Sequence, residues 1–304
     1  MVIPIHDKNP VRRTPYITYA IIAINVAVFL IGPTAGLPTS PSPAQACAQQ
    51  RFFLEYGAIP HELLTNHQLL TAQLPRVLVS TDLGQRLCVF GPLPHKVPAL
   101  SVLTAMFVHA GWLHLIGNML FLYVFGNNVE DRFGRIHFTI FYLAGGYLAT
   151  YAFAWLNPNS DGPLVGASGA IAAVLGAYLF LYPRAKVTSL VPFLLFLPLR
   201  FPAWLVLGSW FVLQLPPVQR LIGVPTDSTV AYMAHVAGFL AGFVYTILAV
   251  GRGDSGRGSP GPGSPGTQGP RSGRRSPRPA PEWGAPDPYG AGNPYPPRYP
   301  APPE

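Results

Sequence analysis

The chain has 304 residues, of which 49% are hydrophobic and only 11% are charged. This composition is too apolar for an ordinary soluble domain and indicates a protein that crosses a membrane several times. The formal net charge of +8 does not point to a nucleic-acid partner, because basic residues normally concentrate on the cytoplasmic flanks of membrane helices.

Apolar runs predict six membrane spans. In chain order they cover residues 16–31, 102–125, 137–155, 165–181, 203–215 and 229–250. The fifth span is short and follows a proline-broken apolar segment, residues 191–199. The predicted fold is therefore an all-α, polytopic membrane protein with a bundle of six transmembrane helices. The first run is too long for a cleavable signal and lacks a small-residue cleavage site, so no signal peptide is expected.

Basic residues orient these spans. With the N-terminus in the cytoplasm, 15 of the 20 Lys and Arg residues fall inside and 5 outside, so both termini are predicted to be cytoplasmic. The domains expected are a cytoplasmic segment at 1–13 and a membrane domain at 14–250 with a long outer loop at 34–100. Residues 251–304 are rich in Gly, Pro and Arg and poor in aliphatic residues, which predicts a disordered cytoplasmic tail.

Both cysteines, Cys47 and Cys88, fall in the predicted outer loop. An even number of cysteines in an oxidising compartment permits a disulfide, and two buried free thiols are the alternative. The sequence leaves both open.

A serine and a histidine occupy two different spans. Ser168 starts the fourth span within the run Gly166-Ala167-Ser168-Gly169, and His235 lies in the sixth. Ionisable groups at membrane depth usually mark function. Both spans are expected to run inward from the outer face, and six residues at about 1.5 Å each place His235 roughly 9 Å deep. At the start of its helix, Ser168 would lie beside backbone N–H groups that can stabilise an oxyanion.

Small residues repeat at intervals of four along these two spans. They are Ser168, Ala172 and Gly176 in the fourth span and Ala234, Gly238 and Gly242 in the sixth. Such faces let membrane helices approach closely, and if they meet, the imidazole of His235 can act as general base for the Ser168 hydroxyl. The alternative is that these faces only pack and that Ser168 bonds a backbone carbonyl.

The second span adds further polar groups. His114 and Asn118 are four residues apart on one helical face, and both can donate hydrogen bonds to an oxyanion. His109 lies nearer the start of the span and is expected to bond loop backbone. Because no Asp or Glu lies in the middle of these spans, the sequence supports a Ser–His dyad rather than a triad. The histidines lack carboxylate or cysteine co-ligands, so neither a metal nor another cofactor is expected.

Four separated motifs together resemble the rhomboid family of intramembrane serine proteases, of the bacterial six-helix type. In the family's order they are His109-x4-His114-x3-Asn118, residues 126–134 (GNNVEDRFG), residues 166–169 (GASG) and residues 234–239 (AHVAGF). The resemblance covers about residues 14–250. It implies a nucleophile at Ser168, a base at His235, and an oxyanion hole made by His114, Asn118 and the Ser168 N–H. It also implies a structural role for Glu130 at the cytoplasmic end of the second span.

By this resemblance the chain would be a serine-type endopeptidase of the cell membrane whose site opens to the extracytoplasmic face. Its partners would be the lipid bilayer and membrane proteins with a destabilised transmembrane helix. One departure is Ala172, where many members carry an aromatic residue stacked on the catalytic histidine. The alternatives are a non-proteolytic rhomboid-like protein that binds membrane clients and a small transporter. Retention of both Ser168 and His235 disfavours the former, and the absence of an internal repeat disfavours the latter.

Overall fold

The structure is a computed structural model that describes residues 2–36, 41–192, 195–223 and 231–254. The chain forms two compact units, Met1–Gly258 and Ser259–Glu304, and the description below concerns the first. The predicted tail lies outside the described residues from position 255 onward, and so does Thr229, the expected start of the sixth span.

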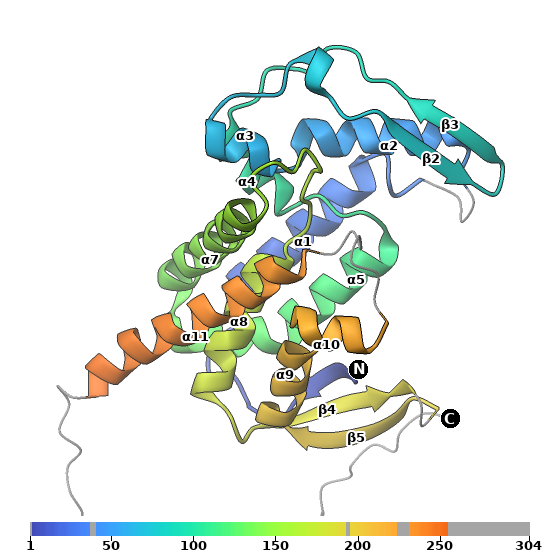
Figure 1. The fold of residues 1–304 in the computed structure, drawn as a ribbon. Coiled ribbons are helices and arrows are strands. Elements are labelled where there is room, and N and C mark those ends of the chain that lie inside the picture. Colours follow the sequence, from blue (N-terminus) through green and yellow to red (C-terminus); the bar gives the residue numbers. More distant parts are fainter. Residues whose placement is uncertain (1, 37–40, 193–194, 224–230, 255–304) are drawn as a thin grey trace, which may run out of the picture. The chain divides into compact units, whose positions relative to one another are not determined.

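Apolar helices form the body of the first unit (Figure 1). They are α1 (Tyr16–Ile31), α5 (Trp112–Phe121), α7 (Arg135–Leu156), α8 (Ser168–Leu181), α9 (Ala203–Val212) and α11 (Tyr232–Asp254), with the short α10 (Pro216–Leu221) after α9. Among the described residues, α7 and α11 are long and apolar enough to cross a membrane, whereas α1, α8 and α9 are shorter apolar helices.

The prediction that the second span begins at residue 102 is wrong, because the continuous helix begins only at Trp112. Residues 98–105 form a separate helix, α4 (Pro98–Ala105), and the chain then leaves the helical conformation before Trp112. From there a helical backbone runs through α5, a π-helical turn η2 (Leu122–Gly126) and α6 (Asn127–Phe133). Gly134 ends this rod with a φ of +83°, a conformation that favours glycine. Apolar residues on both sides of the break had concealed it in the sequence.

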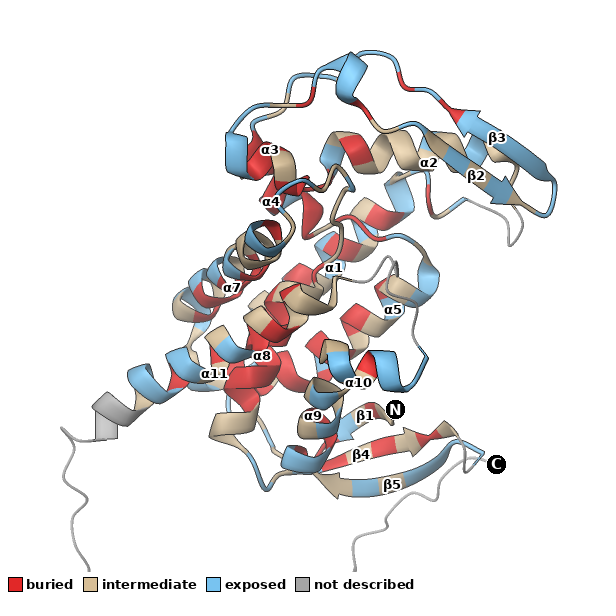
Figure 2. Cartoon of the chain, viewed as in Figure 1, coloured by how far each residue is buried: buried red, intermediate tan, exposed pale blue. Residues whose placement is uncertain are grey.

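Helix α8 lies at the centre of the bundle and is largely buried, whereas the helices around it have exposed outer faces (Figure 2). Every residue of α8 from Ala170 to Tyr178 is buried. The surrounding helices expose large apolar side chains, among them Ile24 and Leu30 of α1, Leu113 and Ile116 of α5, Ile140 and Leu148 of α7, and Leu240, Val244 and Leu248 of α11. An exposed apolar surface this extensive is unsuited to water and suits lipid chains.

Close backbone contact joins α8 to α11. A Cβ atom added to Gly238 would collide with the carbonyl oxygen of Gly169, and one added to Gly242 would collide with that of Ala173. A Cβ atom at Gly176 would in turn collide with the carbonyl oxygen of Phe239. The small-residue faces predicted for the two spans therefore meet. On α8 the contact includes the predicted Ala172 and Gly176, together with Gly169 and Ala173.

Two antiparallel sheets correct the all-α expectation. One has the strand order β1 (Ile3–Asp7), β4 (Lys186–Val191), β5 (Leu197–Pro202) and lies at one end of the bundle (Figure 1). The segment 191–199 was read from the sequence as a broken apolar stretch. In the structure Val191 is the last residue of β4, and residues 197–199 are the first of β5. The prolines of this segment and their β-branched neighbours suit a hairpin better than a helix.

At the other end of the bundle, residues 41–97 form a region with its own small core, called here the α2–β3 region (Figure 1). It contains α2 (Pro43–Tyr56), α3 (Pro60–Thr65), the 3₁₀ turn η1 (Thr71–Gln73), β2 (Val77–Thr81) and β3 (Gly84–Cys88). Leu54, Ile59 and Phe90 are among its buried side chains. The structure joins Cys47 to Cys88 in a disulfide, the first of the two alternatives that the sequence left open.

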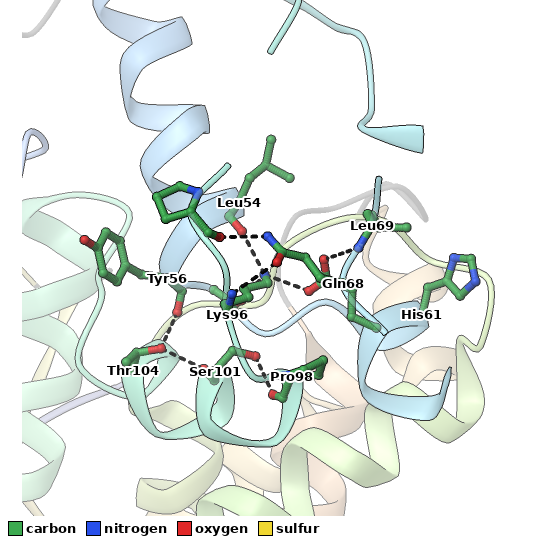
Figure 3. A network of polar contacts seen from close by, with 12 residues as sticks. Leu54, Tyr56, His61, Gln68, Leu69, Lys96, Pro98, Ser101 and Thr104 are labelled. Atoms are coloured by element: carbon green, nitrogen blue, oxygen red, sulfur yellow. Dashed lines mark hydrogen bonds and ion pairs between the residues drawn. The ribbon is translucent and has the colours of Figure 1, made fainter. Parts of the chain in front are cut away.

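A buried ion pair anchors the α2–β3 region (Figure 3). The Lys96 ammonium lies 2.7 Å from the Glu62 carboxylate and donates hydrogen bonds to the carbonyls of Leu54, at 2.8 Å, and Gly57, at 3.2 Å. The other oxygen of Glu62 accepts a hydrogen bond from the N–H of Leu69. Burial lowers the pKa of Lys96, and the neighbouring carboxylate opposes that shift. All three donors of this ammonium are thus engaged.

Candidate active site

Ser168 is the first residue of α8, and backbone hydrogen bonds hold the segment before it in place. Leu164 exchanges two backbone hydrogen bonds with Ala58 of the α2–β3 region, and the N–H of Gly166 donates to the carbonyl of Ala105 at 2.8 Å. Gly166 has a φ of +119°, which a residue with a side chain rarely adopts. The chain can therefore turn sharply into α8 and place the Ser168 hydroxyl beside the free N–H groups of the first helical turn.

His235 lies in the first turn of α11, which begins at Tyr232. Its Nε2 atom is 2.8 Å from the Oγ atom of Ser168. This distance is that of a hydrogen bond between a hydroxyl and an imidazole. The close approach of α8 and α11 at Gly238 explains how two residues 67 positions apart come together.

The second ring nitrogen of His235 is also engaged. Its Nδ1 atom lies 2.7 Å from the Oε1 atom of Gln214, a buried residue in the turn after α9. Sequence reasoning missed this residue. The available signal was a single amide side chain within the apolar fifth span, where a polar group usually has a specific partner.

Aromatic rings from neighbouring segments surround the imidazole of His235. The ring of Trp210, on α9, lies 5.9 Å away at an angle of 35°, and that of Tyr232 lies 6.3 Å away, edge-on. Ala172, where the family often has an aromatic residue, instead faces Gly238 across the tight α8–α11 contact. The ring contact that Ala172 does not supply therefore comes partly from α9.

His114 faces the serine from α5. Its Nδ1 atom accepts a hydrogen bond from the N–H of Ala110 at 3.3 Å, so the neutral ring carries its proton on Nε2. The Nε2 edge lies against Gly166, where an added Cβ atom would come within 2.8 Å of it. A donor N–H of His114 is thus directed toward the turn that precedes Ser168.

Asn118, one turn further along α5, is buried and donates one amide hydrogen to the carbonyl of His114 at 2.8 Å. Its second amide hydrogen is not used by that bond. His109 is buried as well, and its ring packs edge-on against the ring of His114. The sequence predicted a hydrogen bond from His109 to loop backbone. In the structure neither ring nitrogen of His109 has a hydrogen-bond partner.

Glu130 contacts the first turn of α1, away from Ser168. Its carboxylate accepts hydrogen bonds from the N–H groups of Ile17 and Thr18 and from the Thr18 hydroxyl, at 2.7–3.0 Å. A carboxylate at a helix N-terminus satisfies orphan donors and interacts favourably with the helix dipole. These contacts are those of a structural residue.

In the described part of the chain, no group of three or more His, Cys, Asp or Glu side chains has the arrangement of a metal site. Hydrogen bonds join Ser168, His235 and Gln214, and His114 lies against Gly166 with Asn118 bonded to its carbonyl. This set can move a proton and stabilise a negative charge on oxygen, which are the requirements of acyl transfer.

The fold and these residues define a helical membrane protein with a polar site between its helices. A family model of the rhomboid domain matches residues 98–252, just over half of the chain. The chain therefore belongs to the rhomboid family, as its motifs predicted. Ser168, Gln214 and His235 all lie within the matched residues, whereas the α2–β3 region precedes them.

Similarity to individual rhomboid proteins is moderate. "RHOMBOID-like protein 6, mitochondrial" of Arabidopsis thaliana is 29% identical over 161 residues, covering 51% of this chain and 45% of the relative. "Rhomboid protein 1, mitochondrial" of Saccharomyces cerevisiae is 28% identical, covering 56% and 53%. "RHOMBOID-like protein 1" of Arabidopsis thaliana is 26% identical, covering 77% and 54%. The chain thus spans about half the length of the relatives that it matches.

Proposed function

We propose that this rhomboid-family chain is a serine-type endopeptidase that cleaves transmembrane helices of other membrane proteins. The observation that carries the proposal is the 2.8 Å contact between Ser168 Oγ and His235 Nε2 at the start of two closely packed helices. A serine hydroxyl is a weak nucleophile until an adjacent base accepts its proton, and this geometry supplies that base.

The reaction then proceeds in two halves. Ser168 Oγ attacks the carbonyl carbon of the substrate peptide while its proton passes to His235 Nε2. The tetrahedral intermediate collapses, the C–N bond breaks, and His235 returns the proton to the leaving amine. Water attacks the carbonyl carbon of the resulting ester while His235 accepts its proton. The bond from that carbon to Ser168 Oγ then breaks, His235 returns the proton to Oγ, and the acid product leaves.

Three donors would stabilise the oxyanion of the tetrahedral intermediate. They are the backbone N–H of Ser168 at the start of α8, the Nε2–H of His114 and the remaining amide hydrogen of Asn118. Such pre-oriented donors act strongly where water is largely excluded. The position of the His114 ring against Gly166, just before Ser168, supports this assignment.

The proposed setting is the cell membrane, with six spans made by α1, α5–α6, α7, α8, α9 and α11 and both termini in the cytoplasm. The site would open toward the extracytoplasmic face, where water is available for hydrolysis. By likeness to the family, α9 would be the lateral gate. Substrate helices would need local extension, so Gly, Pro or polar residues near the cleaved bond should favour cleavage.

The test is cleavage of a reporter single-span protein by the purified chain in liposomes. Ser168→Ala and His235→Ala are expected to abolish cleavage. Asn118→Ala should retain partial activity, because losing one oxyanion donor costs about 3–4 kcal/mol. The matched control is Thr139→Ala on α7, whose hydroxyl bonds the Arg135 carbonyl of the same helix and whose loss should leave the rate unchanged.

Full activity in Ser168→Ala would overturn the proposal. A protein that binds clients without cutting them would capture the reporter and give no product with either Ser168 or Ala at this position. Product that depends on Ser168 therefore separates the two functions.

A further inference from the structure

We propose that Gln214 is a positioning residue that fixes the tautomer and orientation of His235, an inference that rests on the proposed peptidase function. The Oε1 atom of Gln214 lies 2.7 Å from His235 Nδ1, and the opposite ring nitrogen is 2.8 Å from the Ser168 hydroxyl. Ser168, His235 and Gln214 thus form one continuous hydrogen-bonded chain across α8, α11 and the end of α9.

A second contact fixes which way the Gln214 amide points. Its Nε2 atom donates to the backbone carbonyl of Trp210 at 3.3 Å. A carbonyl oxygen only accepts hydrogen bonds, so the NH₂ group must face Trp210 and the amide oxygen must face His235. The amide oxygen also only accepts, so His235 carries its proton on Nδ1. Nε2 is left unprotonated, as a general base for Ser168 requires.

The neutral amide suits the surroundings of His235. Gln214 is only 7% exposed, and an unpaired carboxylate buried to that extent would be costly. Among the described residues, the titratable groups that face His235 are His114 from α5 and Tyr232 from its own helix. Neither is an acid that could accept the Nδ1 proton at neutral pH. Gln214 therefore supplies the acceptor that an aspartate supplies in soluble serine proteases, without adding a charge.

The same segment also contacts the face of the imidazole. Trp210 lies one helical turn before Gln214, and its ring is 5.9 Å from that of His235. Because Ala172 offers no ring from α8, both the acceptor and the nearest tilted aromatic ring come from α9 and its C-terminal turn. The inference thus requires this end of α9 to remain against α11 while the peptide bond is cleaved.

Two substitutions test the role in the full-length protein in liposomes. Gln214→Met keeps the length of the side chain and removes the acceptor. We expect kcat to fall by about 10–100-fold, less than the ~10⁴-fold loss caused by removing an orienting aspartate from a triad, with KM nearly unchanged. Gln214→Glu keeps an acceptor and should retain more activity than Gln214→Met. Its negative charge favours the imidazolium, so the acidic limb of the pH profile of kcat/KM should move to higher pH.

The control is Gln68 of the α2–β3 region, a partly buried glutamine whose amide donates to the Pro94 carbonyl. Gln68→Met should leave kcat and the pH profile unchanged. Wild-type kcat in Gln214→Met, an equal loss of kcat in Gln68→Met, or an unmoved pH profile in Gln214→Glu would each overturn the inference. Failure of the wild type itself to cleave would instead contradict the proposed peptidase function.

Discussion

The α8–α11 interface and the α2–β3 region are built on opposite principles. In the interface, Gly169, Gly238 and Gly242 bring two apolar helices into backbone contact without a charged group. The α2–β3 region has a small core and relies on a disulfide and a buried Lys96–Glu62 pair. Helices within a membrane bundle are stabilised by close packing of small residues, whereas a small region outside the bundle needs covalent and ionic cross-links.

The two regions meet at the segment before Ser168. Ala58 and Leu164 are paired through their backbones, and His61 lies 3.0 Å from the Asp161 carboxylate. Damage to the α2–β3 region can therefore reach the candidate site through this segment. It can also act through the loop before α5, where Gln49 of α2 donates to the Ala110 carbonyl at 3.1 Å. Substitutions in each region can separate stability from activity.

The largest effect is expected from breaking the buried ion pair. Lys96→Met leaves the Glu62 carboxylate buried without its partner, and such a change typically costs about 3–5 kcal/mol of unfolding free energy. Thermal unfolding in detergent would measure the loss. His61→Ala, which breaks a half-exposed pair, is the control and should cost at most about 1 kcal/mol. Equal losses in the two variants would contradict the importance given to burial.

A somewhat smaller effect is expected from the disulfide. Replacing both Cys47 and Cys88 by serine frees a loop closed across 41 residues and should cost about 2–4 kcal/mol. Non-reducing mass spectrometry of the wild type should find no alkylatable thiol. Two alkylatable thiols in the native protein, or an unfolding temperature unaffected by a reductant, would contradict the pairing.

A substitution in the α8–α11 interface should lower the unfolding free energy less than the two changes above, but it should lower peptidase activity more. In Gly238→Ala the new methyl group collides with the Gly169 backbone, and overpacking of this kind costs about 1–3 kcal/mol. Displacing His235 by about 1 Å should lower peptidase activity about 100-fold. Gly208→Ala on α9, where a Cβ atom meets nothing within 4 Å, is the control. Unchanged activity in Gly238→Ala would show that close helix contact does not hold the pair together.

The smallest effect is expected at Asp7 on β1, whose carboxylate accepts hydrogen bonds from Tyr178 and Asn128. Burial raises the pKa of Asp7 above 3.8, against the opposing effect of these bonds. Because the pKa of Asp7 is higher in the folded protein, protonated Asp7 contributes fully to the unfolding free energy below pH 3.8. This contribution is lost as the pH rises through the pKa that Asp7 has in the folded protein.

Asp7→Asn should therefore gain in unfolding temperature relative to the wild type as the pH rises through that interval. Unfolding of both proteins from pH 3.5 to pH 7 would measure the difference. A difference that stays constant or falls with pH would contradict the assignment.

The sequence predicted the parts of the site that depend on local pattern. Ser168 beside a glycine turn, His235 near a helix start, and small residues at intervals of four were all readable because helix geometry converts spacing into shared faces. The structure places these residues together, and their catalytic roles stay predictions. Membership of the rhomboid family and the helical membrane fold are confirmed.

Features that depend on tertiary contact were not readable. The sequence shows Gln214 only as an isolated amide in an apolar run. Its contact with His235 becomes visible only when the end of α9 is placed against α11. The turn between α4 and α5 was hidden because apolar residues continue on both sides of it. The pairing of β4 with β5 was not predicted because residues 191–199 are as apolar as a membrane segment. Only the prolines of this segment argued against a helix.

The proposed peptidase activity requires a Ser168 hydroxyl that His235 activates. Incubation of the purified protein with a fluorophosphonate probe, followed by peptide mass spectrometry, would test this. We expect the wild type to carry the label on Ser168 and folded His235→Ala to remain unlabelled. An unlabelled folded wild type, or equal labelling of Ser168 in His235→Ala, would contradict the account.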